Sequence, residues 1–410
     1  MSDRSSNLIR KARPVRKKPT LDFSFVGVVY TCLMLFMGLA AIHSQANLLF
    51  AVFGIMIGVL VVSGLVSRIV LRKLEIRRVL PETCTVGQQS TVQYEFDNRK
   101  RFWPSFSVTL SEISSAEAFT RQPLAYLLHV AAGQRAMVSA QVIPAHRGLY
   151  RLDRFQVATS FPFGFIKRAS DRRLSDGLLV LPVMGTVDRK LLSMCVSAES
   201  SGSRMKPRRG GTDEFYGVKE FRKGENPRFI YWKRSARTGT LVTREMTHVA
   251  PPRLQIFLDT RLPAGKRTLA AHAAVERAIA MAASLIACTI DEGLAVGLHA
   301  WAAEPLTVQP SRGKRHARDL LAALAKLPVN TAFDAGQLVG SASHLLRRDV
   351  TGVLITPSSD AGPAGVPSRT TWVVISADSP QGRRWFTFSP ETDFEAAIPL
   401  DQLAGLEQAS

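Results

Sequence analysis

The side chains best suited to chemistry or binding are concentrated in residues 226–246, NPRFIYWKRSARTGTLVTREM. This run holds one Trp, one Tyr and five Arg or Lys residues. Aromatic rings among basic side chains suit base stacking and phosphate contacts, whereas guanidinium groups also form bidentate pairs with carboxylates. Acidic residues interleave with the basic ones, at Asp213, Glu214, Glu220, Glu225 and Glu245. We therefore favour an internal ion-pair clasp over a nucleic-acid site, and we leave open whether the clasp also presents a docking surface.

Local signals indicate which elements position this run. Asn226 is suited to cap a helix whose first residue is Pro227, and Thr238-Gly239 is suited to end it. The spacing predicts a helix over 227–237, with strand-like segments before and after it. In that helix Ile230, Arg234 and Arg237 would share one side, while Arg228, Trp232 and Ser235 would share another.

Patterns typical of catalytic or metal sites are missing from the sequence. It contains no GxSxG, HExxH or GxxxxGK[ST] motif. The four cysteines have no zinc-type spacing, and this favours neither a metal site nor a disulfide framework. They are Cys32, Cys84, Cys195 and Cys288. We therefore expect no cofactor and no enzymatic activity.

The formal net charge of +20 raises nucleic acid as a partner. Two uncharged apolar runs, 25–42 and 48–66, point instead to a membrane. Each approaches the ~20 residues that a helix needs to cross a bilayer. Basic residues flank the outer ends of the pair, but the turn between the runs carries none apart from His43. The positive-inside rule therefore places both flanks in the cytoplasm.

A cleaved signal peptide is the alternative for the first run, since it also has a basic front and an apolar middle. The second run follows after only HSQAN, which favours a membrane hairpin. Basic residues beside a membrane also attract anionic lipid, by about 1 kcal/mol each. Lipid therefore accounts for part of the positive charge without nucleic acid.

The remainder of the chain divides into two regions with different residue patterns. Between 74 and 185, short segments alternate apolar and polar residues, as in Val92, Tyr94 and Phe96, and this predicts a small antiparallel sandwich or barrel. A Ser- and Gly-rich stretch follows, which we interpret as a linker. After it, strands alternate with helices, as in a mostly parallel sheet. Residues past the strand ends are candidate ligand contacts: Asp259, Thr356 and Asp378.

Segment 211–245 resembles the signature of the domain-of-unknown-function family numbered 58. The matching positions are Glu214, Phe215, Gly224, Pro227, Arg228, Trp232, Lys233, Ser235, Ala236, Arg237, Thr238, Arg244 and Glu245. The resemblance extends to HRGLYRL at 146–152 and PFG at 162–164. It implies a bacterial membrane protein with a membrane α-hairpin, a β-rich sandwich-like domain and a doubly wound α/β domain like that of von Willebrand factor A.

The α/β domain departs from one pattern of that fold. Adhesion-type von Willebrand factor A domains bind a metal through Asp-x-Ser-x-Ser after the first strand. Here the loop reads DTRLP, with Arg261 and Pro263 in place of the two serines, and Pro357 replaces a later acid. Since Mg²⁺ needs a near-octahedral set of oxygen ligands, we expect no metal at Asp259. Asp259 is expected to cap its loop or to pair with an Arg.

Together these features predict six regions. They are a basic cytoplasmic tail (1–22), a two-helix transmembrane hairpin (23–70), a β-rich domain (74–185), a linker (186–209), the signature motif (210–250) and the von Willebrand factor A-like domain (251–410).

The resemblance also implies a scaffold or adaptor that acts with a MoxR-type AAA+ ATPase in the assembly or maturation of partner proteins. We expect a multi-pass protein of the bacterial cytoplasmic (inner) membrane with both termini in the cytoplasm. Membrane lipids and a transglutaminase-like membrane protein are further expected partners, and nucleic acid is not. Two alternatives stay open: an enzyme with a site near Asp259, and a basic surface for lipid or nucleic acid.

Overall fold

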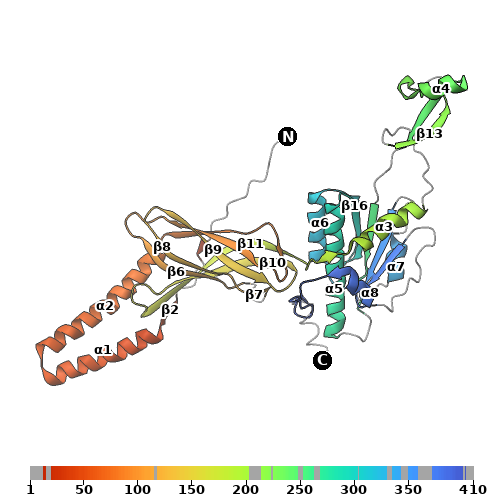
Figure 1. Cartoon of the computed structure of the whole chain (residues 1–410). Coiled ribbons are helices and arrows are strands. Elements are labelled where there is room, and N and C mark those ends of the chain that lie inside the picture. The colour runs from red at the N-terminus through yellow and green to blue at the C-terminus, as the bar shows by residue number, and fades with distance from the viewer. Residues whose placement is uncertain are drawn as a thin grey trace. The chain divides into compact units, whose positions relative to one another are not determined.

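The chain forms two compact units in the computed structural model, Met1–Val183 with Ala396–Ser410 and Met184–Glu395 (Figure 1). The structure describes residues 13–14, 20–114, 118–202, 214–222, 225–247, 253–262, 268–302, 304–329, 335–342, 350–358, 372–399 and 402.

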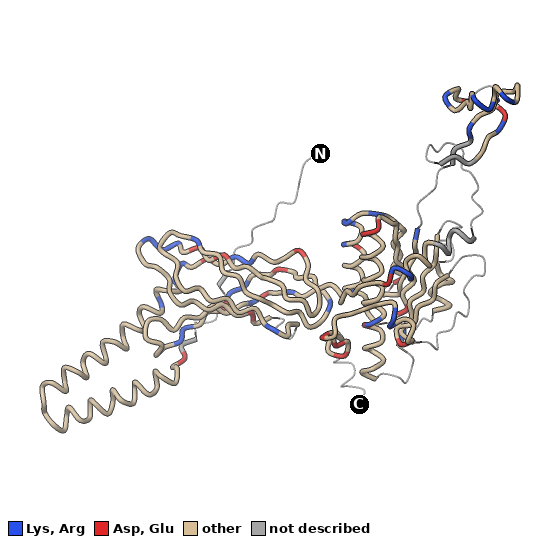
Figure 2. Tube along the Cα trace, in the orientation of Figure 1, with Lys and Arg blue, Asp and Glu red and all other residues tan. Residues whose placement is uncertain are grey.

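Two apolar helices open the first unit: α1 (Phe25–Ser44) and α2 (Asn47–Leu71). Ser24 caps α1 by accepting a hydrogen bond from the Gly27 N–H at 3.1 Å. Figure 2 shows the hairpin without charged residues along most of its length. A helix of 20 residues is about 30 Å long, the thickness of the hydrocarbon core of a bilayer. Both helices are therefore long and apolar enough to cross a membrane, as predicted.

A third helix, α5 (Leu269–Asp291), also meets that test of length and composition. It differs because 78% of its most apolar window is buried inside the protein, against 17% for α1 and 6% for α2. Helix α5 is thus a core helix of the second unit.

The β-rich region consists of two sheets. One has the order β3-β5-β9-β7, with β3 at Leu74–Val79, β5 at Ser90–Asn98, β7 at Phe119–Arg121 and β9 at Arg135–Pro144. The other has the order β1-β11-β10-β6-β8, with β1 at Arg13–Pro14, β6 at Ser105–Glu112, β8 at Leu124–Val130, β10 at Gly148–Thr159 and β11 at Ile166–Leu181. Strands β2 (Thr20–Phe23) and β4 (Cys84–Thr85) also pair with β11.

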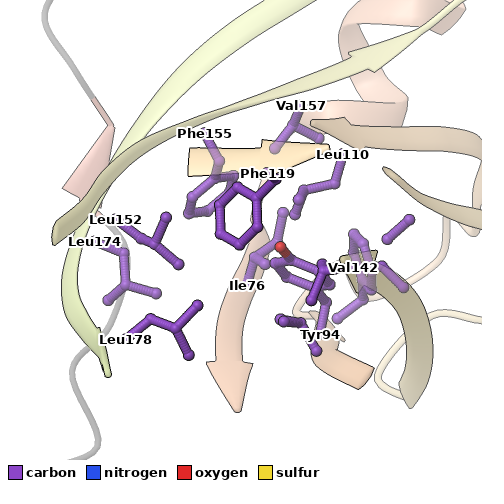
Figure 3. Close-up of a cluster of buried hydrophobic side chains, with 14 of the residues drawn as sticks. Ile76, Tyr94, Leu110, Phe119, Val142, Leu152, Phe155, Val157, Leu174 and Leu178 are labelled. Carbon is purple, nitrogen blue, oxygen red and sulfur yellow. The ribbon is translucent and has the colours of Figure 1, made fainter. Parts of the chain in front are cut away.

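Side chains from both sheets fill one core (Figure 3). Val92, Tyr94 and Phe96 of β5 are buried, as their alternation predicts. Opposite them, Leu110 and Val157 come from the second sheet. The apolar faces of two sheets are thereby removed from water, which confirms the predicted β-rich domain.

One charged network is buried within this domain. The Arg78 guanidinium donates to both carboxylate oxygens of Glu112, at 2.9 and 2.8 Å, and to Asp176 at 2.8 Å. The Tyr94 hydroxyl donates to Glu112 at 2.8 Å. The side chains of Arg78 and Glu112 are both fully buried. Because Arg78 and Glu112 each have several partners, the network satisfies these two buried charged groups.

The predicted α/β domain at 251–410 extends too far, because the described residues 396–399 belong to the first unit. Ala397 lies in the core of the β-rich domain. The sequence-based prediction placed this segment in the α/β domain because the short apolar segment around Ala397 carries no periodicity that would separate it from the preceding elements.

The second unit contains a five-stranded sheet of order β17-β16-β15-β18-β19. Its strands are β15 (Arg253–Leu258), β16 (Ala295–Trp301), β17 (Pro305–Ser311), β18 (Val350–Thr356) and β19 (Trp372–Ser376). All pairs are parallel except β16 with β17. Strand β18 is buried along its whole length, as expected for a sheet covered on both faces. The antiparallel edge strand β17 is missing from the sequence-based prediction.

Among the described residues of this unit, five helices accompany the sheet. They are α3 (Arg189–Gly202), α5, α6 (Lys314–Ala325), α7 (Ala335–Ser341) and α8 (Pro380–Trp385). A pair of short strands, β12 (Thr186–Val187) and β20 (Phe386–Thr387), joins the two ends of the unit.

Helix α3 corrects the prediction of a linker over 186–209. It packs against β18 and β19, and Leu191, Leu192 and Cys195 are buried. These three residues share one side of the helix at spacings of one and four, which provides an apolar stripe. The Ser- and Gly-rich sequence that follows concealed this short stripe.

Candidate functional site

The signature motif folds as a small module built on two antiparallel strands. Strand β13 (Glu214–Glu220) pairs with β14 (Val242–Thr247), with Val218 opposite Arg244 and Glu220 opposite Val242. Between them lie the 3₁₀ helix η2 (Pro227–Phe229) and the helix α4 (Trp232–Thr238). The strand–helix–strand order agrees with the prediction.

The predicted single helix over 227–237 is wrong, because the chain breaks at Ile230. Ile230 forms a bridge with Thr243, and the Tyr231 N–H donates to the Val242 carbonyl at 2.7 Å. These contacts to β14 replace hydrogen bonds within a continuous helix. Both predicted ends are nevertheless present: Asn226 caps η2, and Gly239 ends α4 with a φ of 70°.

Ser235 fixes α4 to β14. Its Oγ accepts a hydrogen bond of 2.9 Å from the Val242 N–H, and Ser235 itself is buried. Ile230 and Val242 are also buried. These residues form the structural centre of the module.

Trp232 lies in a different environment from Ser235, contrary to the prediction that they share a side. The Trp232 side chain is 65% exposed. Figure 2 shows Lys and Arg positions along this helical segment of the module. The exposed basic residues are Arg228, Lys233, Arg234 and Arg237. We call Trp232 with these four residues the Trp232 surface.

One ion pair of the kind predicted for the clasp joins β13 to the segment before η2. Lys219 Nζ lies 2.7 Å from Glu225 Oε1. Arg244 instead places its guanidinium 4.4 Å from the centre of the Tyr231 ring, as a cation–π contact. Backbone pairing, the Ser235 hydrogen bond and this stacked pair all join the parts of the module.

Some signature residues cannot be assigned a contact. Gly224 lies outside the described residues, and for Glu214, Phe215 and Glu245 the structure describes the backbone alone. Their predicted place in the clasp stays a prediction.

The predicted strand-end residues lie together at the carboxyl edge of the sheet. Asp259 is buried, and its Oδ1 accepts a hydrogen bond of 2.9 Å from the Arg261 N–H. This is the loop-capping role expected for it. Thr356 is buried too and donates to the Ser358 carbonyl at 3.0 Å. Among the described residues, no group of three or more His, Cys, Asp or Glu side chains is placed to hold a metal ion.

A cavity of about 650 Å³ opens at the same edge. Asp378, which was predicted, lines it beside Arg261. Arg277 of α5 and Arg383 of α8 also line it and lie 3.1 and 3.7 Å from the Asp378 carboxylate. Burial lowers the pKa of Arg277, and the nearby positive charge of Arg383 lowers it further, while Asp378 raises it.

The sequence did not point to Arg277, Arg383 or Phe394 in this cavity. The Arg277 guanidinium lies 5.2 Å from the centre of the Phe394 ring, more than 100 residues further along the chain. Arg277 belongs to an Ala-rich helix whose composition indicates packing alone. The presence of a charged residue, Arg277, in this apolar helix was the signal in the sequence that could have indicated a site.

The motif module and most of the sheet fall within one family match. Residues 217–359 match the model of a family described as protein of unknown function DUF58. This chain carries a DUF58 domain. The match begins in β13 and ends just after β18, so the DUF58 region includes the Trp232 surface, Asp259 and Thr356. A comparison with curated proteins gives no match.

Proposed function

We propose that this DUF58 protein is a membrane-anchored scaffold or adaptor whose Trp232 surface docks a protein partner. The observation that carries the proposal is the exposure of Trp232 in a module centred on Ser235. A large exposed aromatic residue contributes little to the module's own packing. Trp and Arg are the residue types most enriched at the energetic centres of protein interfaces.

The hairpin of α1 and α2 supports membrane anchorage. Exposed apolar side chains lie along both helices, among them Phe36, Leu48 and Ile55. Arg68 and Arg72 follow the apolar part of α2 and are exposed. By the positive-inside rule this end lies in the cytoplasm, which places the β-rich and α/β units there as well. The proposed location is the bacterial inner membrane, with two membrane passes and both termini in the cytoplasm.

The strand order supports a von Willebrand factor A-like, doubly wound fold for the second unit. From the central strand β15, the chain first adds β16 on one side and later adds β18 and β19 on the other. Such a reversal creates a crevice at the carboxyl ends of the central strands. The cavity beside Asp378 lies at this edge.

The proposed partner is a MoxR-type AAA+ ATPase, acting with this protein in the assembly or maturation of client proteins. A membrane protein with a transglutaminase-like domain is a candidate client. The basic charge of the Trp232 surface favours a partner that presents acidic side chains around an apolar pocket.

Co-purification in detergent tests the proposal. The full chain is expected to retain the ATPase in a manner that depends on ATP. Trp232→Ala and Arg237→Ala are expected to lose the ATPase while keeping the melting temperature of the wild type. Unfolding in both variants would instead assign these residues to a structural clasp, and an ATPase that never associates would overturn the proposal.

The cavity favours a second candidate, an enzyme of unassigned reaction at the strand ends. It combines volume for a small ligand with charged groups held in fixed positions. On this hypothesis Asp259→Ala abolishes function in cells while folding and ATPase capture persist. A wild-type phenotype for Asp259→Ala would exclude it.

A further inference from the structure

Two loops of the β-rich domain are fixed to the base of the helical hairpin. The first loop, 99–104, joins β5 to β6, and its Lys100 Nζ donates to the carbonyls of Ile69 and Val70 at 3.1 and 2.8 Å. These carbonyls lie in the last turn of α2, where Ile69 also accepts from the Arg72 N–H and Val70 from the Ser105 hydroxyl. Lys100 also reaches Ser105 Oγ at 2.6 Å. The first loop therefore lies at the level where α2 ends.

The second loop, 160–165, joins β10 to β11 and contacts the start of α1. The Ser24 N–H donates to the Phe165 carbonyl at 3.1 Å. The Tyr30 and Phe165 rings stack with their centres 4.2 Å apart. A Cβ atom at Gly27 would overlap the Phe165 carbonyl oxygen, so loop and helix are in close contact. We call 99–104 and 160–165 the base loops.

Both base loops expose aromatic side chains. Phe102 is 76% exposed, Trp103 54% and Phe163 49%. Phe23, just before α1, is 55% exposed. The hydrophobic core of the domain does not include these four rings. Packing within the sandwich therefore does not explain why the four positions are aromatic.

The base loops contact the hairpin at the position where the boundary of a bilayer is expected. Helix α1 has 20 residues and spans about 30 Å, so a membrane that takes up this helix has one boundary near Phe25. The base loops contact the hairpin at Ser24 and at Ile69, which lie at this boundary. Trp and other aromatic side chains favour that zone, where an apolar body meets polar headgroups.

Basic side chains also lie near this expected boundary of the bilayer. Arg68 and Arg72 of the α2 end and Arg101 of the first base loop are exposed. Arg168 lies close enough to Arg68 for the two positive charges to interact, and burial is the larger cause that lowers the pKa of Arg168. Asp22 lies opposite Lys167 in the pairing of β2 with β11. The exposed guanidinium groups are suited to lipid phosphates.

We propose that the base loops enter the interfacial layer of a phospholipid bilayer, where Phe23, Phe102, Trp103 and Phe163 insert beside the acyl chains and Arg68 and Arg101 bind lipid phosphates. The proposal rests on membrane anchorage by the hairpin. It goes further in making the β-rich domain itself a lipid-binding part of the protein. The base loops would thereby hold the domain against the membrane surface.

Fluorescence quenching in proteoliposomes tests the proposal. The full chain is reconstituted in phosphatidylcholine that carries bromine on the upper part of its acyl chains. Bromine is expected to quench a component of the emission that Trp103→Phe removes. Trp372→Phe, which alters a partly buried ring of the α/β sheet, is the control and is expected to leave that component in place.

A second pair of variants keeps the test independent of Trp103. In the Trp103→Phe background, Phe163→Trp is expected to restore the quenched component. Leu149→Trp is the matched control, because Leu149 is 55% exposed at the far end of the 12-residue strand β10, about 35 Å from its base loop. A quenched fraction that is the same in Trp103→Phe and wild type, or equal for Phe163→Trp and Leu149→Trp, would overturn the proposal.

Carbonate extraction separates this proposal from the anchorage on which it rests. A chain that stays in the membrane at alkaline pH while Trp103 is not quenched would refute the insertion of the base loops alone. A chain that is extracted would refute the anchorage itself.

Discussion

The Ser235 hydroxyl on α4 accepts a hydrogen bond of 2.9 Å from the Val242 N–H on β14. This bond joins the helix of the signature motif to its strand within a buried centre. Ser235→Ala would leave a buried backbone donor without its partner, at a cost of about 1–3 kcal/mol. We expect faster hydrogen exchange across 225–247, measured by mass spectrometry. Thr240→Ala, which changes an exposed hydroxyl in the same module, is expected to leave the exchange unchanged.

Glu112 shares its carboxylate between Arg78 and Tyr94 inside the β-rich domain. Glu112→Ala leaves the buried guanidinium without this counter-ion and is expected to lower the free energy of unfolding by about 3–5 kcal/mol. Denaturant titration in detergent, followed by tryptophan fluorescence, measures the change. Glu95→Ala removes partly exposed pairs with Arg77 and Arg135 and is expected to cost less than about 1 kcal/mol. An equal loss in the free energy of unfolding for the two variants would contradict the conclusion that the buried pair contributes more to stability than the partly exposed pairs.

Gly27 lets α1 approach the second base loop. Because a Cβ there would overlap the Phe165 carbonyl, Gly27→Ala is expected to separate helix and loop and to lower the melting temperature in detergent. Gly58→Ala on α2 is the matched control, since a Cβ at Gly58 meets no atom within 4 Å. A melting temperature that falls equally in both variants would show that helix flexibility, and not the close contact, is responsible.

Lys100 gives the stability a dependence on pH. Burial lowers the pKa of Lys100 from 10.5 to about 8. Below pH 8 the Lys100 amine is charged in both the folded and the unfolded state, and the folded state bears the cost of burying the charge. Between about pH 8 and 10.5 the folded protein has released the proton and the unfolded chain still holds it, so the free energy of unfolding increases with pH.

The measurement is the difference in unfolding free energy between wild type and Lys100→Met from pH 7.5 to 9.5. The comparison cancels the titration of other groups, such as Cys84, whose pKa is also shifted by burial. We expect the wild type to gain stability relative to Lys100→Met across this window. A constant difference would refute the lowered pKa of Lys100.

Much of the fold could be predicted because it depends on local patterns. The alternation of Val92, Tyr94 and Phe96 indicated a strand with one buried face, and the two apolar runs indicated α1 and α2. Helix α3 was missed because its stripe of Leu191, Leu192 and Cys195 is short and runs into a Ser-rich sequence.

The candidate sites were harder to predict, because they depend on contacts between distant residues. Arg277 and Asp378 are 101 positions apart, and only the parallel sheet brings them together. In the motif, the caps at Asn226 and Gly239 were evident, but the break at Ile230 depends on its bridge to Thr243. Trp232 and Ser235 were therefore placed on one side, although one is exposed and the other buried.

The central claim is that the Trp232 surface docks a protein partner. The most direct measurement is capture of a purified MoxR-type AAA+ ATPase by the full chain in detergent, with the melting temperature recorded for each variant. We predict that the wild type captures the ATPase and that Trp232→Ala fails to do so with its melting temperature unchanged, whereas Leu241→Ala, at a second exposed apolar residue of the module, captures it normally. Equal capture by wild type and Trp232→Ala, or no capture by the wild type, would contradict the claim.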